Sequence, residues 1–353
     1  MLRSFNFKIL VVVCGVWLGG VVGNTWGDVR YSVTQLPCLQ GDRIFVAASI
    51  NESNQIAGYS TGPTSSTIGI LDNGSFTAIP LLPGASYGVA RDINDSGVVV
   101  GDMRIGSDVY PFIWDKTNGT RSLGVLPGHS GGYATCVNNL GQIGGFTDDQ
   151  PEEGWIWDST NGMRPLGGFV SDINDIGQVV GYAKMSHPDY SAFLWDNTNG
   201  MQELAVPTGY ATSVAISINE SGQIVGRAER PDGQEHAALW NAGEMTELDT
   251  HPGETSYSIA RSINESGQVF IEVGGGPPFI WDSINLMQDL STLVPENSAP
   301  NLSTGGGGSI NDRGYIVSIN YLFSPVPEPS TLVLLLAGAG AFLAYSWRKW
   351  PKS

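Results

Sequence analysis

Apolar and polar residues alternate along most of this chain in short runs that end at Asn, Asp or Gly. Runs such as YGVARDIN (residues 87–94) and YSIARSIN (257–264) have the period of two expected of a half-buried strand. The chain also contains 47 Gly among its 353 residues, while only 14% of its residues are charged. Because tight turns need residues that accept a positive φ, this pattern predicts a turn-rich, all-β protein.

One phrase recurs along the chain, as INDSGVVVG (93–101), INDIGQVVG (173–181) and INESGQIVG (218–226). The Asn at its second position recurs at intervals of 43, 44, 36, 45, 45 and 47 residues. These residues are Asn51, Asn94, Asn138, Asn174, Asn219, Asn264 and Asn311. A repeat of this length predicts a stack or a ring of equivalent units.

Each repeat holds four predicted strands. The phrase joins the first two, an aromatic run such as PFIWD (111–115) forms the third, and a run such as MQELAVPTG (201–209) forms the fourth. Four short strands per repeat predict the blade of a β-propeller, and seven copies predict seven blades. The last copy ends at YIVSINYLF (315–323) without a fourth strand, so YSVTQLP (31–37) is predicted to complete that blade and close the ring.

The polar and aromatic residues of the repeats each have two interpretations. In Asn94-Asp95-Ser96-Gly97 the Asn side chain can bond the backbone two residues on, while Gly97 takes the left-handed conformation. The alternative is calcium ligation, although no turn alternates enough carboxylates to match a calcium loop. The aromatic runs place one large ring per unit, either between adjacent blades or as a ring of sugar platforms. These rings belong to Trp114, Trp157, Trp195, Trp240 and Trp281.

Residues 1–27 have the parts of a secretory signal peptide. Arg3 and Lys8 supply positive charge, an apolar run follows, and small residues end the segment. A signal peptidase is therefore an expected partner. The repeat region, residues 28–324, is expected to leave the cytoplasm.

The C-terminal segment, residues 325–353, combines a proline-bounded motif, an apolar run and a basic tail. The motif is Val326-Pro327-Glu328-Pro329, a transmembrane helix is expected over residues 331–347, and Arg348 and Lys349 follow it. The basic end is expected to stay on the cytoplasmic side of the membrane. This order predicts a membrane anchor that follows a recognition site.

These C-terminal residues resemble a PEP-CTERM sorting signal. The resemblance implies recognition by an exosortase, a membrane-embedded transpeptidase, followed by cleavage and release or surface attachment. A plain single-pass anchor is the alternative. The repeats, with HAALW (236–240) and SAFLW (191–195), resemble the HAF family of extracellular repeats, although only His236 supplies the His. That resemblance implies an exported repeat architecture and no common activity.

Candidate chemistry is sparse. The net charge of −17 disfavours nucleic acid as a partner. Two cysteines outside the signal segment, Cys38 and Cys136, either form a disulfide or stay unpaired. Neither a metal site nor a cofactor site is predicted. Four histidines occupy unrelated repeat positions and are expected to be solvated loop residues. They are His129, His187, His236 and His251.

One acidic loop offers paired carboxylates of the kind that glycoside hydrolases use. It contains Asp148, Asp149, Glu152 and Glu153, and neighbouring surface acids of this kind are usually only solvated. No catalytic residue is therefore predicted.

Together these patterns predict an exported cell-surface or extracellular-matrix protein that is not an enzyme. It is expected to bind a partner or exopolysaccharide through its propeller, and to reside in the inner membrane only until its C-terminus is processed. The alternative is a secreted hydrolase or lyase that acts on polysaccharide from the same scaffold. Convergent His, Asp, Glu or Arg side chains at one mouth of the channel would favour the enzyme.

Overall fold

The computed structural model describes residues 30–62, 66–185, 190–248, 257–296, 298 and 307–326. The predicted signal peptide, the helix predicted over residues 331–347, and Arg348 and Lys349 lie outside these ranges. Within the described ranges, no helix has the length and apolar character needed to cross a bilayer.

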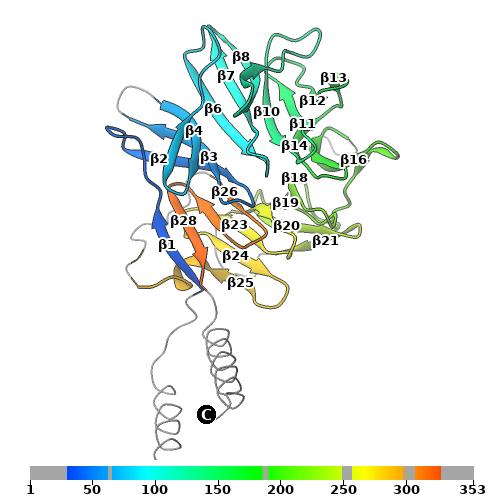
Figure 1. The fold of residues 1–353 in the computed structure, drawn as a ribbon. Coiled ribbons are helices and arrows are strands. Elements are labelled where there is room, and N and C mark those ends of the chain that lie inside the picture. Colours follow the sequence, from blue (N-terminus) through cyan, green and yellow to red (C-terminus); the bar gives the residue numbers. More distant parts are fainter. Residues whose placement is uncertain are drawn as a thin grey trace, which may run out of the picture.

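The described strands form seven antiparallel sheets of four strands each, arranged in a ring (Figure 1). Residues of all seven sheets line a cavity at the centre of this ring, which opens one end of a central channel. The all-β, seven-bladed propeller predicted from the repeats is therefore confirmed. Blade 1 contains β2 to β5, blades 2 to 6 each use the next four strands, and blade 7 combines β26, β27 and β28 with β1. The first strand of each blade contacts the first strands of both neighbours, so these strands surround the channel.

The bounds of the strands are as follows. The first strands are β2 (Ile44–Ile50), β6 (Tyr87–Ile93), β10 (Gly132–Val137), β14 (Phe169–Ile173), β18 (Thr212–Ile218), β22 (Ser258–Ile263) and β26 (Gly308–Ile310). The second strands are β3 (Ile56–Thr61), β7 (Val99–Ile105), β11 (Ile143–Thr147), β15 (Val179–Ala183), β19 (Ile224–Glu229), β23 (Val269–Val273) and β27 (Ile316–Ser318). The third strands are β4 (Ser66–Asp72), β8 (Asp108–Asp115), β12 (Gly154–Asp158), β16 (Ser191–Asp196), β20 (Glu235–Asn241), β24 (Phe279–Asp282) and β28 (Tyr321–Pro325). The fourth strands are β5 (Ser75–Ala78), β9 (Gly119–Ser122), β13 (Gly162–Pro165), β17 (Gly200–Glu203), β21 (Glu244–Glu247), β25 (Leu286–Asp289) and β1 (Tyr31–Gln35), and a 3-10 turn, η1 (Leu290–Thr292), follows β25.

Seven hydrophobic clusters hold the propeller together, and each lies between two neighbouring blades. Trp114, for example, packs with Ile68 and Ile70 of the preceding blade. Trp240 packs with Val180 and Ala192 in the same way. Each blade thus buries both faces of its sheet, which explains why the repeated aromatic residue fills the space between adjacent blades.

The shortest connection between blades consists of residues 166–168, between β13 and β14. Gly167 and Gly168 both have positive φ, at 92° and 63°. A Cβ atom on Gly168 would lie 2.8 Å from the carbonyl oxygen of Tyr182, so only glycine fits there. Blades 3 and 4 nevertheless keep four strands each, as expected for a shortened connection rather than a lost strand.

The N-terminal strand lies at the outer edge of the last blade. β1 pairs antiparallel with β28, with Tyr31 opposite Pro325 and Gln35 opposite Tyr321. The backbone N–H of Val326 also donates to the carbonyl of Arg30, at 2.7 Å. The two ends of the described propeller therefore lie side by side on one blade.

Candidate functional site at the channel

The repeated asparagines form a closed ring of hydrogen bonds at one mouth of the channel. The Oδ1 atom of Asn94 accepts the N–H groups of Ser96 and Val98, at 3.1 and 3.0 Å, and so holds the turn of its own blade. Its Nδ2 atom donates to the carbonyl of Asn138 in the next blade, at 3.0 Å. The same bond links every blade to the next and ends with Asn311, which donates to the carbonyl of Asn51 at 3.0 Å.

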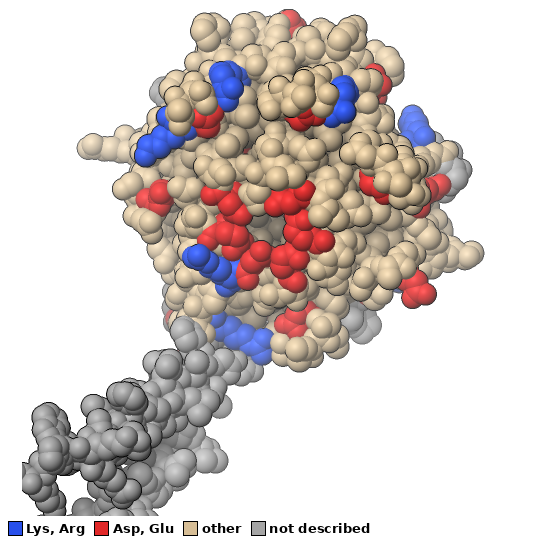
Figure 2. All heavy atoms as spheres, turned by 45° about the vertical axis from the view of Figure 1, so that its right-hand side comes forward, with Lys and Arg blue, Asp and Glu red and all other residues tan. Residues whose placement is uncertain are grey.

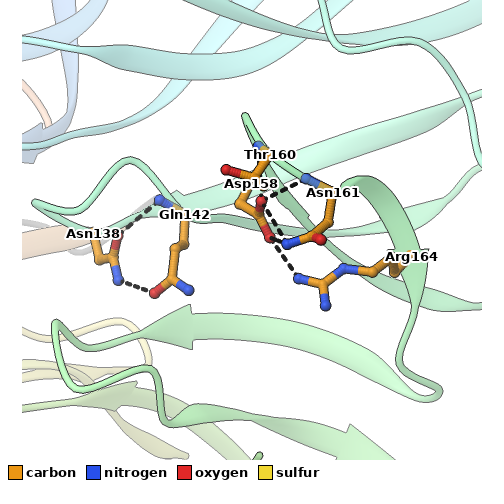
Figure 3. Close-up of polar contacts among 6 residues, drawn as sticks. All are labelled: Asn138, Gln142, Asp158, Thr160, Asn161 and Arg164. Atoms are coloured by element: carbon orange, nitrogen blue, oxygen red, sulfur yellow. Dashed lines mark hydrogen bonds and ion pairs between the residues drawn. The ribbon is translucent and has the colours of Figure 1, made fainter.

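The asparagine ring gives each turn carbonyl a second donor, because that carbonyl also accepts the backbone N–H three residues on, as Asn94 does from Gly97 at 3.0 Å. All seven side chains are buried, with exposed fractions between 3% and 6%. In five blades the Asn Nδ2 atom also donates to a Gln in its own turn, as Asn138 does to Gln142 at 2.8 Å (Figure 3). The ring therefore positions the turns and connects neighbouring blades, and its amides are occupied by protein groups.

A second ring, of acidic residues, surrounds the same mouth. The residue after each ring Asn lines a cavity of about 320 Å³, and Figure 2 shows the carboxylates around its opening. These residues are Glu52, Asp95, Asn139, Asp175, Glu220, Glu265 and Asp312. Each backbone N–H in this acidic ring donates to the side chain of its neighbour, from Glu52 to Asp95 at 2.9 Å through to Asp312 to Glu52 at 2.6 Å.

These contacts set the electrostatics of the mouth. Burial raises the pKa of Glu52 and Glu220, and the neighbouring carboxylates raise it further, while the backbone N–H bonds act in the opposite direction. The arrangement thus concentrates negative charge at one end of the channel, with one oxygen of each carboxylate held by a backbone donor. The sequence indicated these residues only as turn positions, because their convergence depends on the closure of the ring.

Two further carboxylates lie deeper in the channel wall, two positions before the ring Asn. Asp92 accepts the hydroxyl of Ser49 at 2.7 Å and the N–H of Val137 at 2.8 Å. Asp172 accepts the N–H of Ile218 at 2.9 Å, and burial together with the charge of Asp92 raises the pKa of Asp172 to about 6. The repeat pattern did not indicate either carboxylate, although Ser or Cys occupies this position in the other blades.

Cys136 occupies the same position in the blade between them. Burial, with Asp172 and Asp92 nearby, raises the pKa of its thiol well above the usual value, which makes it a poor nucleophile. Cys38 and Cys136 are both free, so of the two alternatives the unpaired one describes the structure.

The turns before the fourth strands also direct their carboxylates at protein groups. Asp158 accepts the N–H groups of Thr160 and Asn161, at 2.9 and 2.8 Å, and Arg164 contacts its other oxygen at 2.6 Å (Figure 3). The side chain of Asn161 contributes most to lowering the pKa of Asp158. Among the described residues, no group of three or more His, Cys, Asp or Glu side chains is arranged to hold a metal ion.

The expectation that the histidines are solvated is wrong for His129 and His236. The His129 side chain is only 12% exposed, and its Nδ1 and Nε2 atoms lie 2.6 and 3.4 Å from Asp149 and Glu153. His236 is buried at the start of its strand, with Nδ1 3.4 Å from Glu247. His187 and His251 lie outside the described residues.

The predicted acidic loop therefore forms a polar cluster around His129. The hydrogen bond that the imidazole makes to the Asp149 carboxylate raises the pKa of His129 most, and Glu153 raises it further. Ser130 donates its hydroxyl to Asp149 at 3.1 Å rather than to the imidazole, and Tyr133 donates to Asp148 at 2.5 Å. This geometry differs from a nucleophile–base pair, in which the hydroxyl must face the imidazole.

The sorting motif directly follows the last strand. β28 ends at Pro325 and Val326 is bonded to Arg30, while Pro327, Glu328 and Pro329 lie outside the described residues. In each blade the first strand runs toward the asparagine ring, and successive strands run in opposite directions because they pair antiparallel. A third strand therefore ends, and a fourth begins, on the face that carries this ring. Both ends of the described propeller leave it on that face.

Comparisons with known proteins agree with this architecture. Residues 325–349 match the PEP-CTERM protein-sorting motif, and residues 158–239 match a family described as a protein of unknown function, DUF3466. The sorting-motif match indicates an exported protein with an envelope or surface location, and an exosortase-type sorting enzyme as its partner. The resemblance to HAF repeats stays a prediction. A comparison with curated proteins finds no match.

Several solved structures share the fold at low sequence identity. A streptogramin B lyase has a TM-score of 0.57 at 12% identity, over 86% of this chain and all (100%) of that one. Selenomethionine-substituted virginiamycin B lyase from Staphylococcus aureus has a TM-score of 0.56 at 13% identity, over 85% and 100% of the two chains. YCF48 bound to D1 peptide has a TM-score of 0.51 at 12% identity, over 85% and 96%. At these identities the likeness shows the propeller fold alone.

Proposed function

We propose that this protein is a non-enzymatic binding scaffold of the cell surface or extracellular matrix. It binds a surface partner or exopolysaccharide through its propeller, after an exosortase-like transpeptidase has processed its C-terminus. The observation that carries the proposal is the sorting motif at residues 325–349, which begins at the last residue of the propeller. The apolar segment 331–347, for which the sequence predicts a transmembrane helix, would hold the chain in the inner membrane until cleavage.

The polar groups of the channel support a binding role over catalysis. Asparagine-ring amides bond to backbone carbonyls, and each residue of the acidic ring accepts a backbone N–H. Groups held in this way stabilise the fold and shape a charged surface. Catalysis would need an acid, base or nucleophile directed at a substrate atom.

The alternative, a hydrolase or lyase, has one observation in its favour. Six carboxylates converge at one mouth of the channel, which is the kind of convergence expected of an active site. Release of reducing or unsaturated sugar ends from polysaccharide by the purified protein would establish it. A loss of that release in Glu52→Gln would assign it to this mouth.

We also propose that the N-terminal strand closes the ring. The support for this is its pairing with β28 along all five residues of β1, and the bond from Leu36 N–H to the carbonyl of Asn320 at 2.7 Å. The outer strand of blade 7 then comes from the opposite end of the chain, so that the ring opens only if this pairing is lost.

Mass spectrometry of the mature protein tests the sorting proposal. In a host that has an exosortase, we expect a new C-terminus near Pro329, and we expect Glu328→Ala to accumulate uncleaved in the membrane. Glu296→Ala, at an exposed turn before blade 7, is the matched control and should be processed normally. A native chain that still ends at Ser353 would reduce the motif to an ordinary anchor.

A further inference from the structure

The mouth of the channel opposite the asparagine ring has a different character. In blades 1 to 6, the first-strand residue five positions before the ring Asn lies ~16 Å from the ring. Its pairing partner on the second strand lies at the same level. In blades 1 to 6 this second-strand position holds Tyr59, Asp102, Phe146, Tyr182, Arg227 and Glu272. The residue before it is Gly in blades 1 to 5. An otherwise repetitive unit therefore varies at this level, as a recognition surface does.

Five aromatic rings of blades 3 and 4 form one continuous cluster at this level, which we call the aromatic arc. Its members are Tyr133, Phe146, Phe169, Tyr182 and Tyr190. Neighbouring ring centroids lie 4.6 to 6.4 Å apart, and Phe169 and Tyr182 are stacked with an interplanar angle of 9°. All five side chains are partly exposed, so the arc combines a broad apolar surface with phenolic hydroxyls.

Charged groups flank the arc as pairs of opposite sign. Arg91 lies 5.2 Å from the centroid of the Tyr133 ring and bonds Asp102 at 2.5 Å. On the far side, Arg227 bonds Glu235 at 2.7 Å. Both arginines are about one-third exposed, at 35%. Asp148 and Lys184 also border the arc, since Asp148 accepts the Tyr133 hydroxyl at 2.5 Å and Lys184 lies 5.8 Å from the centroid of the Tyr190 ring. The arc is therefore bordered by charges of both signs, whereas the acidic ring surrounds the other mouth.

The arc also lies where a large ligand can reach it. The connections between successive blades cross this face, and the shortest of them, residues 166–168, leads directly into β14 of the arc. Both ends of the described propeller leave from the opposite face. A chain held through its C-terminus therefore directs the aromatic arc away from its attachment point.

We propose that the aromatic arc binds a neutral segment of a polysaccharide chain. A pyranose ring presents an apolar C–H face that stacks on aromatic rings, while its hydroxyls bond paired charged groups such as Arg91 and Asp102. The acidic mouth lacks such a platform and repels anionic polymers. This inference rests on the proposed function, since it assigns the polysaccharide site of the binding scaffold.

Calorimetry on the full chain in mild detergent tests the site, with cellohexaose, maltohexaose and hexameric oligomannuronate as probes. We expect at least one neutral hexasaccharide to bind, and oligomannuronate to bind more weakly. Tyr182→Leu should weaken the binding at least tenfold, as should Tyr190→Leu, which alters the edge of the arc. Tyr315→Leu, beside the asparagine ring, is the matched control and should bind like the parent.

These experiments distinguish a failure of the saccharide-site proposal from a failure of the sorting proposal. If neither neutral probe binds the parent protein, or if both arc variants bind like the parent, the aromatic arc is not a saccharide site. Normal cleavage of the chain in either case would leave the sorting proposal standing. Conversely, arc-dependent binding by a chain that is never cleaved would support the site and refute the sorting. Saturation transfer from protein to the sugar C–H protons should be seen in the parent and lost in Tyr190→Leu. An unchanged circular dichroism spectrum and melting temperature of Tyr190→Leu would assign that loss to stacking rather than to unfolding.

Discussion

Replacing Asn174 by Asp perturbs the asparagine ring with almost no change in shape. The Asn174 Nδ2 atom donates to the carbonyl of Asn219 at 3.1 Å and to Oε1 of Gln178 at 2.9 Å. Its Oδ1 atom accepts the N–H of Gln178 at 2.9 Å, and the side chain is only 3% exposed. In Asn174→Asp the acceptor remains, but an oxygen faces two other oxygens, so the link to the next blade is lost.

The expected loss of stability is about 3–5 kcal/mol at pH 7. It combines two lost hydrogen bonds at about 1 kcal/mol each with about 1–3 kcal/mol for burying the introduced carboxyl oxygen without a donor. The Asn219 carbonyl itself keeps the N–H of Gly222, at 3.1 Å. The loss should depend on pH, because the introduced carboxyl is held near oxygens and its folded-state pKa rises above the unfolded value of about 3.9. As pH increases, the unfolded chain then ionises first, so the penalty is smallest near pH 4 and grows toward pH 7.

Urea unfolding of the full chain at both pH values measures this effect. Asn241→Asp is the control, since Asn241 is exposed at the end of β20, and it should stay within about 0.5 kcal/mol of the parent. A midpoint for Asn174→Asp equal to that of the parent at pH 7 would refute a stabilising role for the ring. A loss of stability that does not change with pH would refute a raised folded-state pKa of the introduced carboxyl.

Four further changes test other features. Gly177 has a φ of 82°, so Gly177→Val should cost about 1–2 kcal/mol or more in thermal denaturation, and an unchanged melting temperature would contradict the turn geometry. Because the pKa of Asp172 is raised from 3.8 to about 6, stability from this group falls as pH rises between those values, and Asp172→Asn should flatten that part of the pH–stability curve. The raised pKa of His129 stabilises the fold fully below about pH 6.5, and this contribution is lost as pH rises through the folded-state value, so His129→Gln should remove the dependence. Val33→Pro, within β1, should lower stability by more than about 1 kcal/mol if β1 closes the ring, whereas unchanged unfolding would exclude that role.

Local repetition explains which parts of the structure were predictable. The turn at Asn94 needs only residues up to Val98, and Trp114 lies at the same place in its unit as Trp240, so both patterns appear in the sequence. The bond that joins Asn94 to Asn138 is different, because its partner lies 44 residues further along and depends on ring closure.

The environment of single residues was less predictable. His129 is enclosed by Asp149 and Glu153 of a different loop, and no local pattern indicates that contact. The aromatic arc gathers rings from Tyr133 to Tyr190, which come together only through strand register and the short connection between blades 3 and 4. In both cases tertiary packing, rather than a local pattern, decides the outcome.

The same asparagine hydrogen bond joins every pair of neighbouring blades, so the ring does not require the two chain ends to lie in one particular blade. Since Arg30 and Val326 are hydrogen-bonded, a short peptide could join them, and the chain could be reopened between any other two blades. A circular permutant of this kind would move the site of attachment around the rim while keeping both mouths of the channel intact. The present break at blade 7 therefore determines which blade carries the sorting motif, and where the aromatic arc lies around the rim relative to that motif.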